Sequence, residues 1–418
     1  MKKGLIISKE YYPMSNGSIT CLENIINKLK DNYEITVVGY NLAGEFLDYE
    51  KKNGIEIYRI YSKYDLPVTK RNRFLEKRAQ NQELWGKITK LPYIPFYFNA
   101  MKKGLIYPIA WSRNALEYIE KLIVPSKFDF ILAIGGPFEN VRTGVQLSEK
   151  YDIPLYIIEF DLFAYNPTHN LLNIEAVKQN LEEELTWYKQ ANHIFVTKEM
   201  YKTVLNSELN KYKEKITAIN MPNLVPLISK ANNRDEEGYV DILYAGMFYE
   251  DIRNPSTMLK IFSKVFQTNS KIRLHILGIG CENITFKYQK EWPNNIFLYG
   301  KQTKDKVNEL IKKSNFLLNL SNAIATQAPS KIVEYISTCK PIINFYSIDK
   351  DLCVDILKNY SLSISLDQRQ GQEELSLTLL EFIRENEGKT NNIDEITYMY
   401  SEYTPQYVAN KIIDVLEG

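Results

Sequence analysis

Ser330, Lys331 and Glu334 are the residues whose types and spacing most clearly favour chemistry. They lie in ATQAPSKIVEYISTCKPIINF, residues 325–345, whose helical pattern stands between two apolar runs typical of strands, NFLLNL at 315–320 and PIINF at 341–345. Residues three and four apart share one face of a helix, so these side chains would lie together. Backbone N–H groups at a helix start bind phosphate, and a carboxylate one turn deeper can accept hydrogen bonds from a ribose diol. The pattern predicts a nucleotide site, with a solvated helix face as the alternative.

Arg253 adds a second cation to this prediction. It follows the apolar run DILYAGMF, residues 241–248, and precedes Asn254 and Pro255, which mark the start of a helix. A fixed guanidinium at that place could bind a phosphate that also lies at the Ser330 helix. An arginine solvated at a helix start is the alternative.

Glycines follow several predicted strands. Asn16 and Gly17 follow the first strand, Gly246 follows the strand before Arg253, and Gly278 and Gly280 end a later one. Glycine lets a ligand approach the backbone closely, but it also relieves tight turns. The first turn has no GxGxxG pattern, which disfavours a dinucleotide site.

Carboxylates stand where a strand of the first half ends. Glu159 and Asp161 lie in PLYIIEFDLFAYNP, residues 154–167. Ligands of open α/β sheets bind beyond the carboxyl ends of the strands, so these acids are expected to face a cleft. Capping of the loop backbone is the alternative. Asp349 and Asp351 are read as loop residues, and no metal site is predicted.

Strand-like runs alternate with helical patterns along the whole chain, which predicts an α/β fold with parallel sheets. A length of 418 residues suits two domains. We expect a first domain at 1–220, a linker at 221–239, a second domain at 240–403 and a terminal helix at 404–418.

A basic and aromatic stretch at about 63–121 interrupts the first domain as an insertion. Lysine and arginine interleaved with tryptophan, tyrosine and phenylalanine could lie on an anionic membrane surface or bind a lipid-linked acceptor. Two ordinary helices with solvated outer faces are the alternative.

Composition excludes several classes of protein. The 52 basic and 51 acidic residues give a net charge of +1, so nucleic acid is not an expected partner. The 4 cysteines are scattered without ligand spacing and are expected to be reduced. The first residues lack the apolar stretch of a signal peptide and no apolar run reaches about 18 residues, so we expect neither a signal peptide nor a membrane-spanning helix. We expect a cytoplasmic protein, with a peripheral contact to the inner face of the membrane as a further hypothesis.

The segment PSKIVEYISTCKPII, residues 329–343, resembles the PSK-x-x-EY-x-x-x-GKP-I segment of bacterial family 4 retaining glycosyltransferases. The stretch YAGMFYEDIRNP, residues 244–255, is similar to the phosphate site of that family. The resemblance implies a GT-B fold, in which two Rossmann-like domains face each other across a cleft. It also implies that Glu334 holds the ribose of the donor and that the terminal helix crosses back to the first domain.

The resemblance assigns roles to the candidate residues. Arg253 and Lys331 would stabilise the leaving phosphate. The donor nucleotide would be bound by Gly246, Arg253, Gly278, Gly280, Ser330, Lys331, Ile332 and Glu334. Asn16, Gly17, Glu159 and Asp161 would line the acceptor side of the cleft. The nucleotide sugar, expected to be UDP-linked, is a substrate, so no cofactor is predicted.

Three positions depart from the family pattern. Thr326, next to Gln327, stands where many members carry a second glutamate that contacts the donor sugar; Thr326 and Gln327 could still bind sugar hydroxyls. Met247 replaces a first arginine, and Cys339 replaces a glycine. We therefore expect a metal-independent retaining transferase that extends a cell-envelope or capsular glycan. A catalytically silent module that binds nucleotide sugar or supports a partner transferase is the alternative.

Overall fold

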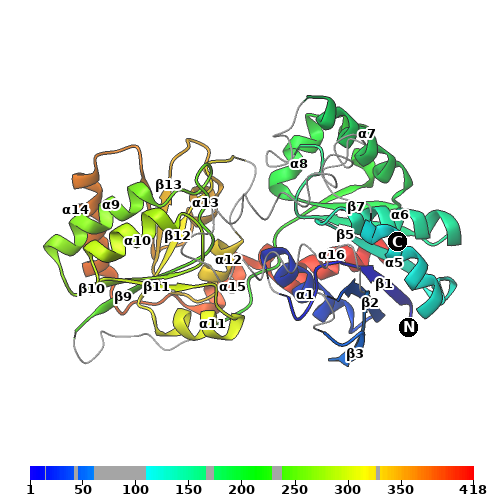
Figure 1. Cartoon of the computed structure of the whole chain (residues 1–418), viewed down its shortest axis with the longest axis horizontal. Helices are drawn as coiled ribbons and strands as arrows, with labels where there is room; N and C mark the ends of the chain where they lie inside the picture. The colour runs from blue at the N-terminus through cyan, green and yellow to red at the C-terminus, as the bar shows by residue number, and fades with distance from the viewer. Residues whose placement is uncertain (15, 42–45, 61–109, 166–173, 228–237, 326–329) are drawn as a thin grey trace. The chain divides into compact units, whose positions relative to one another are not determined.

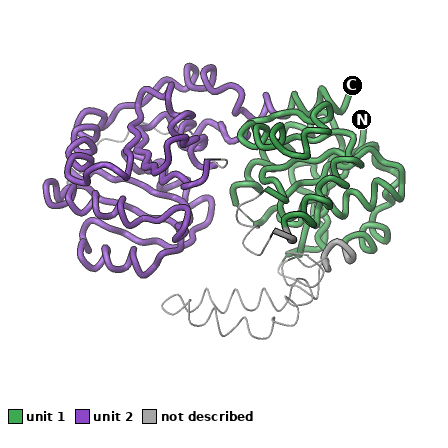
Figure 2. The backbone as a smooth tube through the Cα atoms, turned by 90° about the horizontal axis from the view of Figure 1, so that it is seen from above, with its two compact units in different colours: residues 1–220, 409–418 green, residues 221–408 purple. Residues whose placement is uncertain are grey.

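The computed structural model describes residues 1–418 except 15, 42–45, 61–109, 166–173, 228–237 and 326–329. Helices and strands alternate along the described chain, which confirms the predicted α/β class (Figure 1). The chain divides into two compact units, residues 1–220 with 409–418 and residues 221–408 (Figure 2). The predicted linker, 221–239, starts at this division and lies partly outside the described residues, as does the predicted insertion at 63–121.

Unit 1 is built on an eight-stranded sheet in the order β3-β4-β2-β1-β5-β6-β7-β8, and all of its neighbouring strands are parallel except β3 and β4. The strands are β1 Lys3–Ile7, β2 Glu34–Tyr40, β3 Tyr49–Lys52, β4 Ile55–Ile60, β5 Phe130–Gly135, β6 Leu155–Glu159, β7 His193–Thr197 and β8 Ile216–Ile219. The described helices are α1 Gly17–Leu29, α5 Ala110–Leu122, α6 Glu139–Tyr151, α7 Ile174–Gln190 and α8 Lys198–Leu205, with short 3-10 turns at Pro125–Lys127 and Glu208–Lys215.

The apolar run IEIYRI predicted β4, but its antiparallel partner β3 was not among the predicted elements. Strand β3 reads YEKK, which carries no apolar run, so hydrophobic patterning does not reveal it. The turn does carry a signal, because Asn53 and Gly54 adopt φ of 52° and 85°. Asn-Gly is the preferred pair for a two-residue hairpin turn that needs positive φ at both positions.

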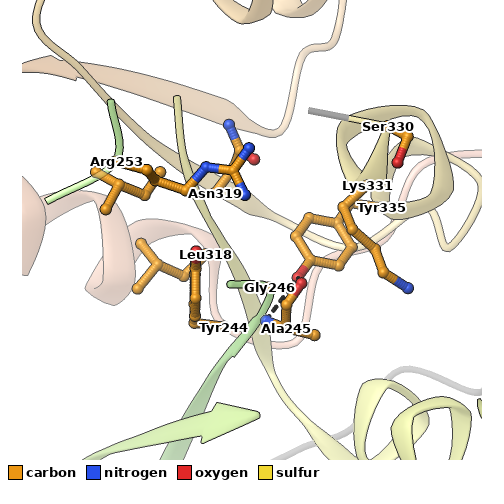
Figure 3. A pocket seen from close by; sticks show the side chains of 10 residues that line it. Tyr244, Ala245, Gly246, Arg253, Leu318, Asn319, Ser330, Lys331 and Tyr335 are labelled. Atoms are coloured by element: carbon orange, nitrogen blue, oxygen red, sulfur yellow. Dashed lines mark hydrogen bonds between the residues drawn. The ribbon is translucent and has the colours of Figure 1, made fainter. Parts of the chain in front are cut away.

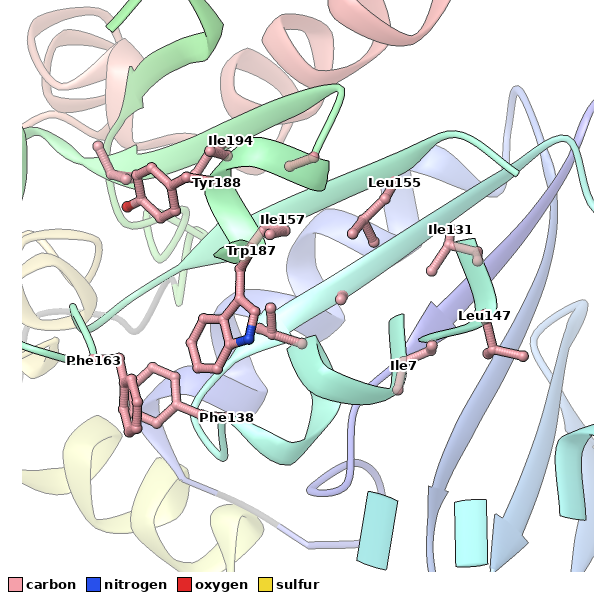
Figure 4. Close-up of a cluster of buried hydrophobic side chains, with 14 of the residues drawn as sticks. Ile7, Ile131, Phe138, Leu147, Leu155, Ile157, Phe163, Trp187, Tyr188 and Ile194 are labelled. Atoms are coloured by element: carbon pink, nitrogen blue, oxygen red, sulfur yellow. The ribbon is translucent and has the colours of Figure 1, made fainter. Parts of the chain in front are cut away.

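One face of the unit 1 sheet packs against α5, α6, α7 and α8. Phe138, Phe163 and Trp187 gather within this core, with ring centroids of Phe138 and Phe163 4.6 Å apart and those of Phe163 and Trp187 5.0 Å apart (Figure 4). Aromatic contacts at such distances add to the free energy of burial. The segment that follows β6 is thereby anchored to α6 and α7.

The end of α16 (Pro405–Glu417), from Ala409 on, belongs to unit 1, although residues 221–408 directly before it form unit 2. The Lys2 ammonium donates to the Leu416 carbonyl, and the Tyr33 hydroxyl donates to the Glu417 carboxylate. Lys411 Nζ donates to the Ala218 carbonyl. These contacts join the last turns of the chain to β8 and to the residues directly before β1 and β2.

Unit 2 is built on a six-stranded sheet in the order β11-β10-β9-β12-β13-β14, with all neighbours parallel. Its strands are β9 Val240–Ala245, β10 Ile272–Leu277, β11 Ile296–Gly300, β12 Phe316–Leu320, β13 Ile342–Tyr346 and β14 Ser363–Asp367. Its helices are α9 Ser256–Thr268, α10 Glu282–Glu291, α11 Lys304–Lys313, α12 Lys331–Ile336, α13 Leu352–Leu357, α14 Gln372–Asn386 and α15 Ile393–Met399, with a 3-10 turn at Ser401–Tyr403.

Strand β9 shows how the sheet of unit 2 is covered on both faces. Ile242 and Tyr244 pack into a core with α9 and α14, whereas Leu243 and Ala245 pack into a second core with α11, α12, α13 and α15. Successive side chains of a strand point to opposite faces, and a parallel sheet with helices on both faces buries both sets. Hence the strand is apolar along almost its whole length.

Candidate functional site

A small cavity lies in unit 2 where β9 and β12 end (Figure 3). Strand β9 has β10 on one side and β12 on the other. The chain therefore adds strands toward one edge of the sheet up to β11 and toward the other edge from β12 on. Ligands of open α/β sheets bind at this switch point. The lining residues are Tyr244, Ala245, Gly246, Arg253, Leu318, Asn319, Leu320, Ser330, Lys331 and Tyr335. Its volume of about 70 Å³ suits a group the size of a phosphate.

Arg253 borders the cavity from the loop between β9 and α9. Its Nε and Nη2 donate to the Asn322 side-chain oxygen at 2.9 and 2.6 Å, and its Nη1 donates to the Met247 carbonyl at 3.2 Å. The loop itself is closed by paired backbone hydrogen bonds between Tyr249 and Arg253. A guanidinium carries five N–H donors, and Asn322 and Met247 use three of them. The Tyr244 hydroxyl, which lines the cavity, also interacts with this guanidinium. Met247, which departs from the family pattern, still helps to hold the arginine through its backbone.

Lys331 and Glu334 lie on α12 and bind each other. Their side chains form an ion pair of 2.6 Å, with 35% of the lysine and 21% of the glutamate side chain exposed. Figure 3 shows Lys331 and Ser330 on the opposite side of the cavity from Arg253. The structure thus brings the two predicted phosphate cations to one cavity. It also places the predicted ribose carboxylate beside Lys331.

Helix α12 has only six residues, and Ser330 precedes it in the right-handed helical region. The Ile332 side chain is fully buried in the core. Only its backbone could therefore meet a ligand. The predicted donor-sugar residues Thr326 and Gln327 lie outside the described residues, as does Pro329.

Tyr335 and Gly246 also line the cavity. The Tyr335 hydroxyl accepts a hydrogen bond from the Ala245 backbone N–H at 2.9 Å, and burial raises the pKa of this hydroxyl far above its usual value. A Cβ on Gly246 would stand 3.0 Å from the Tyr244 hydroxyl. The backbone at the end of β9 is thus held by Tyr335, and it is left uncovered by any side chain of residue 246.

Gly278 and Gly280 have a packing role that needs no ligand. A Cβ on Gly278 would stand 1.7 Å from the Gly246 carbonyl oxygen, and one on Gly280 would stand 2.2 Å from that of Phe248. Their φ angles of 157° and 101° also disfavour side chains. The two glycines let the loop after β10 lie against the loop after β9. Their predicted contact with a nucleobase stays a prediction.

Asn16 and Gly17 lie at the start of α1. The Asn16 side-chain oxygen accepts from the Ile19 backbone N–H at 2.9 Å, and its amide donates to Glu10. These are the contacts of a helix N-cap. Gly17 is the exposed first residue of the helix. The predicted role of Asn16 and Gly17 beside an acceptor stays a prediction.

The expectation that Glu159 faces a cleft is corrected by the structure, because this side chain is fully buried. Glu159 accepts a hydrogen bond of 2.5 Å from the Tyr188 hydroxyl of α7. Burial, followed by repulsion from the neighbouring Glu184, raises its pKa well above the usual range. Asp161 is partly exposed and keeps its predicted role as a prediction.

Glu184, on α7, is the partner acid that the sequence did not reveal. It is also fully buried, and it accepts from the backbone N–H groups of Phe163 and Ala164 at 2.9 and 3.0 Å. Burial raises its pKa to about 7 although these two N–H groups lower it. The two acids fix the segment after β6 to α7.

The remaining candidates take structural roles. Asp351 caps α13 through the backbone N–H groups of Cys353 and Val354, and the exposed Asp349 pairs with Arg369. His193 and His275 bind Thr217 and Asp241 in the sheets. Within the described ranges, no cluster of three or more histidine, cysteine, aspartate or glutamate residues could hold a metal ion.

The sequence did not single out the polar residues at the end of β12 and directly after it. Asn319 donates to the Asn344 side-chain oxygen at 2.7 Å, and the Ser321 hydroxyl contacts both Asn344 and Asp351. All of these side chains are buried, as is Asn322. The only signal in the sequence is NLSN, residues 319–322, which interrupts an apolar run with amides and a hydroxyl.

No protein-family model and no curated protein matches this chain. Solved structures do match it along its length. Anabaena Alr3699/HepE in complex with UDP-glucose has a TM-score of 0.63 at 10% identity, with 100% of both chains covered. The chain has the GT-B fold.

Two further solved structures are similar to this chain. WaaG, a glycosyltransferase involved in lipopolysaccharide biosynthesis, has a TM-score of 0.59 at 10% identity, covering 99% of this chain and 100% of its own. A Listeria monocytogenes protein assigned as a UDP-N-acetylglucosamine 2-epimerase has a TM-score of 0.56 at 11% identity, covering 100% and 96%. The GT-B fold therefore leaves the reaction to be argued from the site. No helix in the described part of the chain is long and apolar enough to cross a bilayer.

Proposed function

We propose that this protein is a retaining glycosyltransferase that moves a sugar from a UDP-linked donor to a cell-envelope or capsular glycan. The observation that carries the proposal is the pair of cations, Arg253 and Lys331, beside one phosphate-sized cavity at the sheet switch point of unit 2. Glu334, one turn along α12, lies next to Lys331. The resemblance of residues 329–343 to family 4 transferases supports the same roles.

The charges suit departure of a nucleoside diphosphate. Negative charge grows on the β-phosphate as the bond to the sugar breaks, and cations held in place lower the energy of that state most. The Arg253 guanidinium is already oriented by Asn322 and Met247, so little reorganisation is required. The Glu334 carboxylate would accept hydrogen bonds from the ribose hydroxyls, while Lys331 would turn from Glu334 toward the diphosphate. The site residues themselves need no metal for these steps.

Two other observations support the proposed acceptor and cellular location. WaaG acts in lipopolysaccharide biosynthesis, and the basic and aromatic stretch at 63–121 suits a lipid-linked or membrane-bound acceptor. We propose that the enzyme works in the cytoplasm, with peripheral contact to the inner face of the membrane.

The test is release of UDP from a panel of UDP-sugars, with and without an acceptor extract from envelope glycan. Acceptor-dependent release, with the sugar recovered on the acceptor, supports transfer. Conversion of the donor into a stereoisomeric sugar without acceptor supports the epimerase reaction instead, whether that sugar stays linked to UDP or water releases it together with UDP. Donor binding without turnover under every acceptor supports the catalytically silent module, which the departures at Thr326 and Met247 motivate.

A further inference from the structure

Asn322 is the main partner of the Arg253 side chain. Its Oδ1 accepts from both Nε and Nη2 of the guanidinium, and 5% of the residue is exposed. The edge of a guanidinium formed by Nε and Nη2 is the one that commonly pairs with a carboxylate in a bidentate manner. Here a neutral amide occupies that edge.

The choice of an amide has an electrostatic consequence. A carboxylate at this position would form an ion pair and cancel most of the positive charge that Arg253 presents. An amide oxygen orients the guanidinium through two hydrogen bonds and leaves its full charge in place. The N–H groups that these partners do not use can then bind an anion in the neighbouring cavity.

Asn322 is itself held by the fold. The preceding Ser321 hydroxyl binds Asp351 at 3.0 Å, and Asp351 is fixed by two backbone N–H groups at the start of α13. The following residue, Ala323, donates its backbone N–H to the Ile252 carbonyl at 2.7 Å. The loop after β12 is thus joined to the loop that carries Arg253. Asp351 thus binds the residue next to Asn322, but its carboxylate caps α13 rather than pairing with Arg253.

We propose that Asn322 is a positioning residue that sets the orientation of Arg253 for a diphosphate while leaving its charge uncancelled. The inference rests on the proposed donor site and deepens it, because it assigns affinity for the phosphates to a buried amide that does not line the cavity. Uridine, which lacks phosphate, separates this role from a general effect on the fold.

The experiment measures binding of UDP and of uridine by calorimetry to the full chain and to Asn322→Asp. The substituted carboxylate keeps the shape of the side chain and can hold the guanidinium even more strongly. We expect the Kd for UDP to rise about tenfold or more, in line with the loss of a charge-assisted contact. The Kd for uridine should stay within about twofold, and the melting temperature without ligand should not fall.

Asn254→Asp is the matched control. Asn254 is exposed, lies next to Arg253 and bonds to Ser256 and Glu250, so its substitution adds the same charge without touching the guanidinium. We expect this control to weaken UDP binding by no more than about twofold to threefold, as suits a screened surface charge. An equal loss of affinity in both variants would overturn the inference, because proximity of negative charge would then explain it.

Asn322→Ala tests the orienting role of Asn322 separately from the charge of Arg253. It keeps the charge of Arg253 and removes its orienting acceptor, so we expect weaker UDP binding with uridine binding unchanged. If Arg253→Ala loses UDP binding while Asn322→Asp binds UDP as the parent does, the role of Asn322 is wrong and the proposed donor site stands. If the parent binds neither UDP nor uridine, both the donor site and this inference fall.

Discussion

Unit 1 and unit 2 use ionisable residues near the carboxyl ends of their strands in opposite ways. In unit 1, Glu159 and Glu184 are completely buried, and burial raises the pKa of each. In unit 2, Arg253 and Lys331 stay partly exposed beside a cavity, and their partners hold them in place. The first arrangement hides its acids from any ligand, whereas the second presents its cations to one.

The comparison teaches that position in the sheet does not by itself make a site. Parallel strands bring their carboxyl ends to one edge in both units, and that rule predicted ligand contact for Glu159 as well as for Arg253. What separates them is burial. A side chain with no exposed surface can organise a loop, but it cannot recognise a substrate without a rearrangement of the core.

The largest expected effect concerns the partly exposed cations of unit 2. Replacing Arg253 with alanine should lower the turnover of sugar transfer about 100-fold to 1,000-fold, because it removes a preorganised donor to the leaving phosphate. Lys260→Ala, an exposed lysine on α9, is the control and should leave turnover unchanged. Steady-state kinetics with the best UDP-sugar measure both. Parent-like turnover in the Arg253 variant would remove this residue from the site.

A buried cation of unit 2 provides the next test. Lys340, the lysine of the CKP motif, is buried and donates to the carbonyls of Ile311, Lys312 and Ser314, and burial lowers its pKa to about 8. Lys340→Met should cost about 2–3 kcal/mol of unfolding free energy, because three carbonyls at the end of α11 lose their donor.

Denaturant unfolding measures that loss, and UDP binding by the folded variant should persist. Lys313→Met, which removes an exposed ion pair from α11, should leave the unfolding free energy nearly unchanged. A loss of UDP binding with unchanged stability would instead make Lys340 part of the site.

Glu334 separates ribose recognition from phosphate recognition. Glu334→Gln should weaken binding of uridine and of UDP by a similar factor of about ten, because both carry the ribose diol. Substitution of Asn322 or Arg253 should affect UDP alone. Glu309→Gln, which breaks a comparable ion pair on α11, serves as the control. Calorimetry with the two ligands decides, and a loss confined to UDP would contradict the ribose assignment.

The smallest expected effect concerns the buried acids of unit 1. Their pKa values are raised in the folded chain, so the folded state retains protons that the unfolded chain releases. The stability of the fold is then lost progressively as the pH rises from the usual glutamate value toward the folded value, which is about 7 for Glu184. Glu159→Gln removes one of the two titrations and should flatten this decline.

Thermal unfolding between pH 5 and pH 9 measures this loss of stability in the parent and in Glu159→Gln. The variant should melt a few degrees above the parent at the alkaline end, and the difference should shrink toward pH 5. Glu149→Gln, at an exposed position on α6, should follow the parent throughout. A constant offset at every pH would mean that the Glu159 carboxyl does not titrate in this range.

Much of the fold was predictable because hydrophobic patterning reports burial. Continuous apolar runs such as those around Ile131 and Leu318 predicted parallel strands, and both are strands covered by helices on their faces. The segment at 329–343 and the arginine after β9 were also recognisable, since their residue types and local spacing carry the signal. Their presence at one cavity followed from the order of strands in the sheet.

The tertiary structure alone decided which residues meet across long separations in the chain. The pairs Glu159–Tyr188, Arg253–Asn322 and Gly278–Gly246 join residues 29, 69 and 32 positions apart, and no local pattern encodes them. It also showed that Cys339, a change between small residues in the sequence, adopts φ of 61°, which glycine accepts more readily. Hydrophobic periodicity predicts which side chains are buried. The partner of a residue, its charge state and its backbone strain depend instead on the parts of the chain that pack around it.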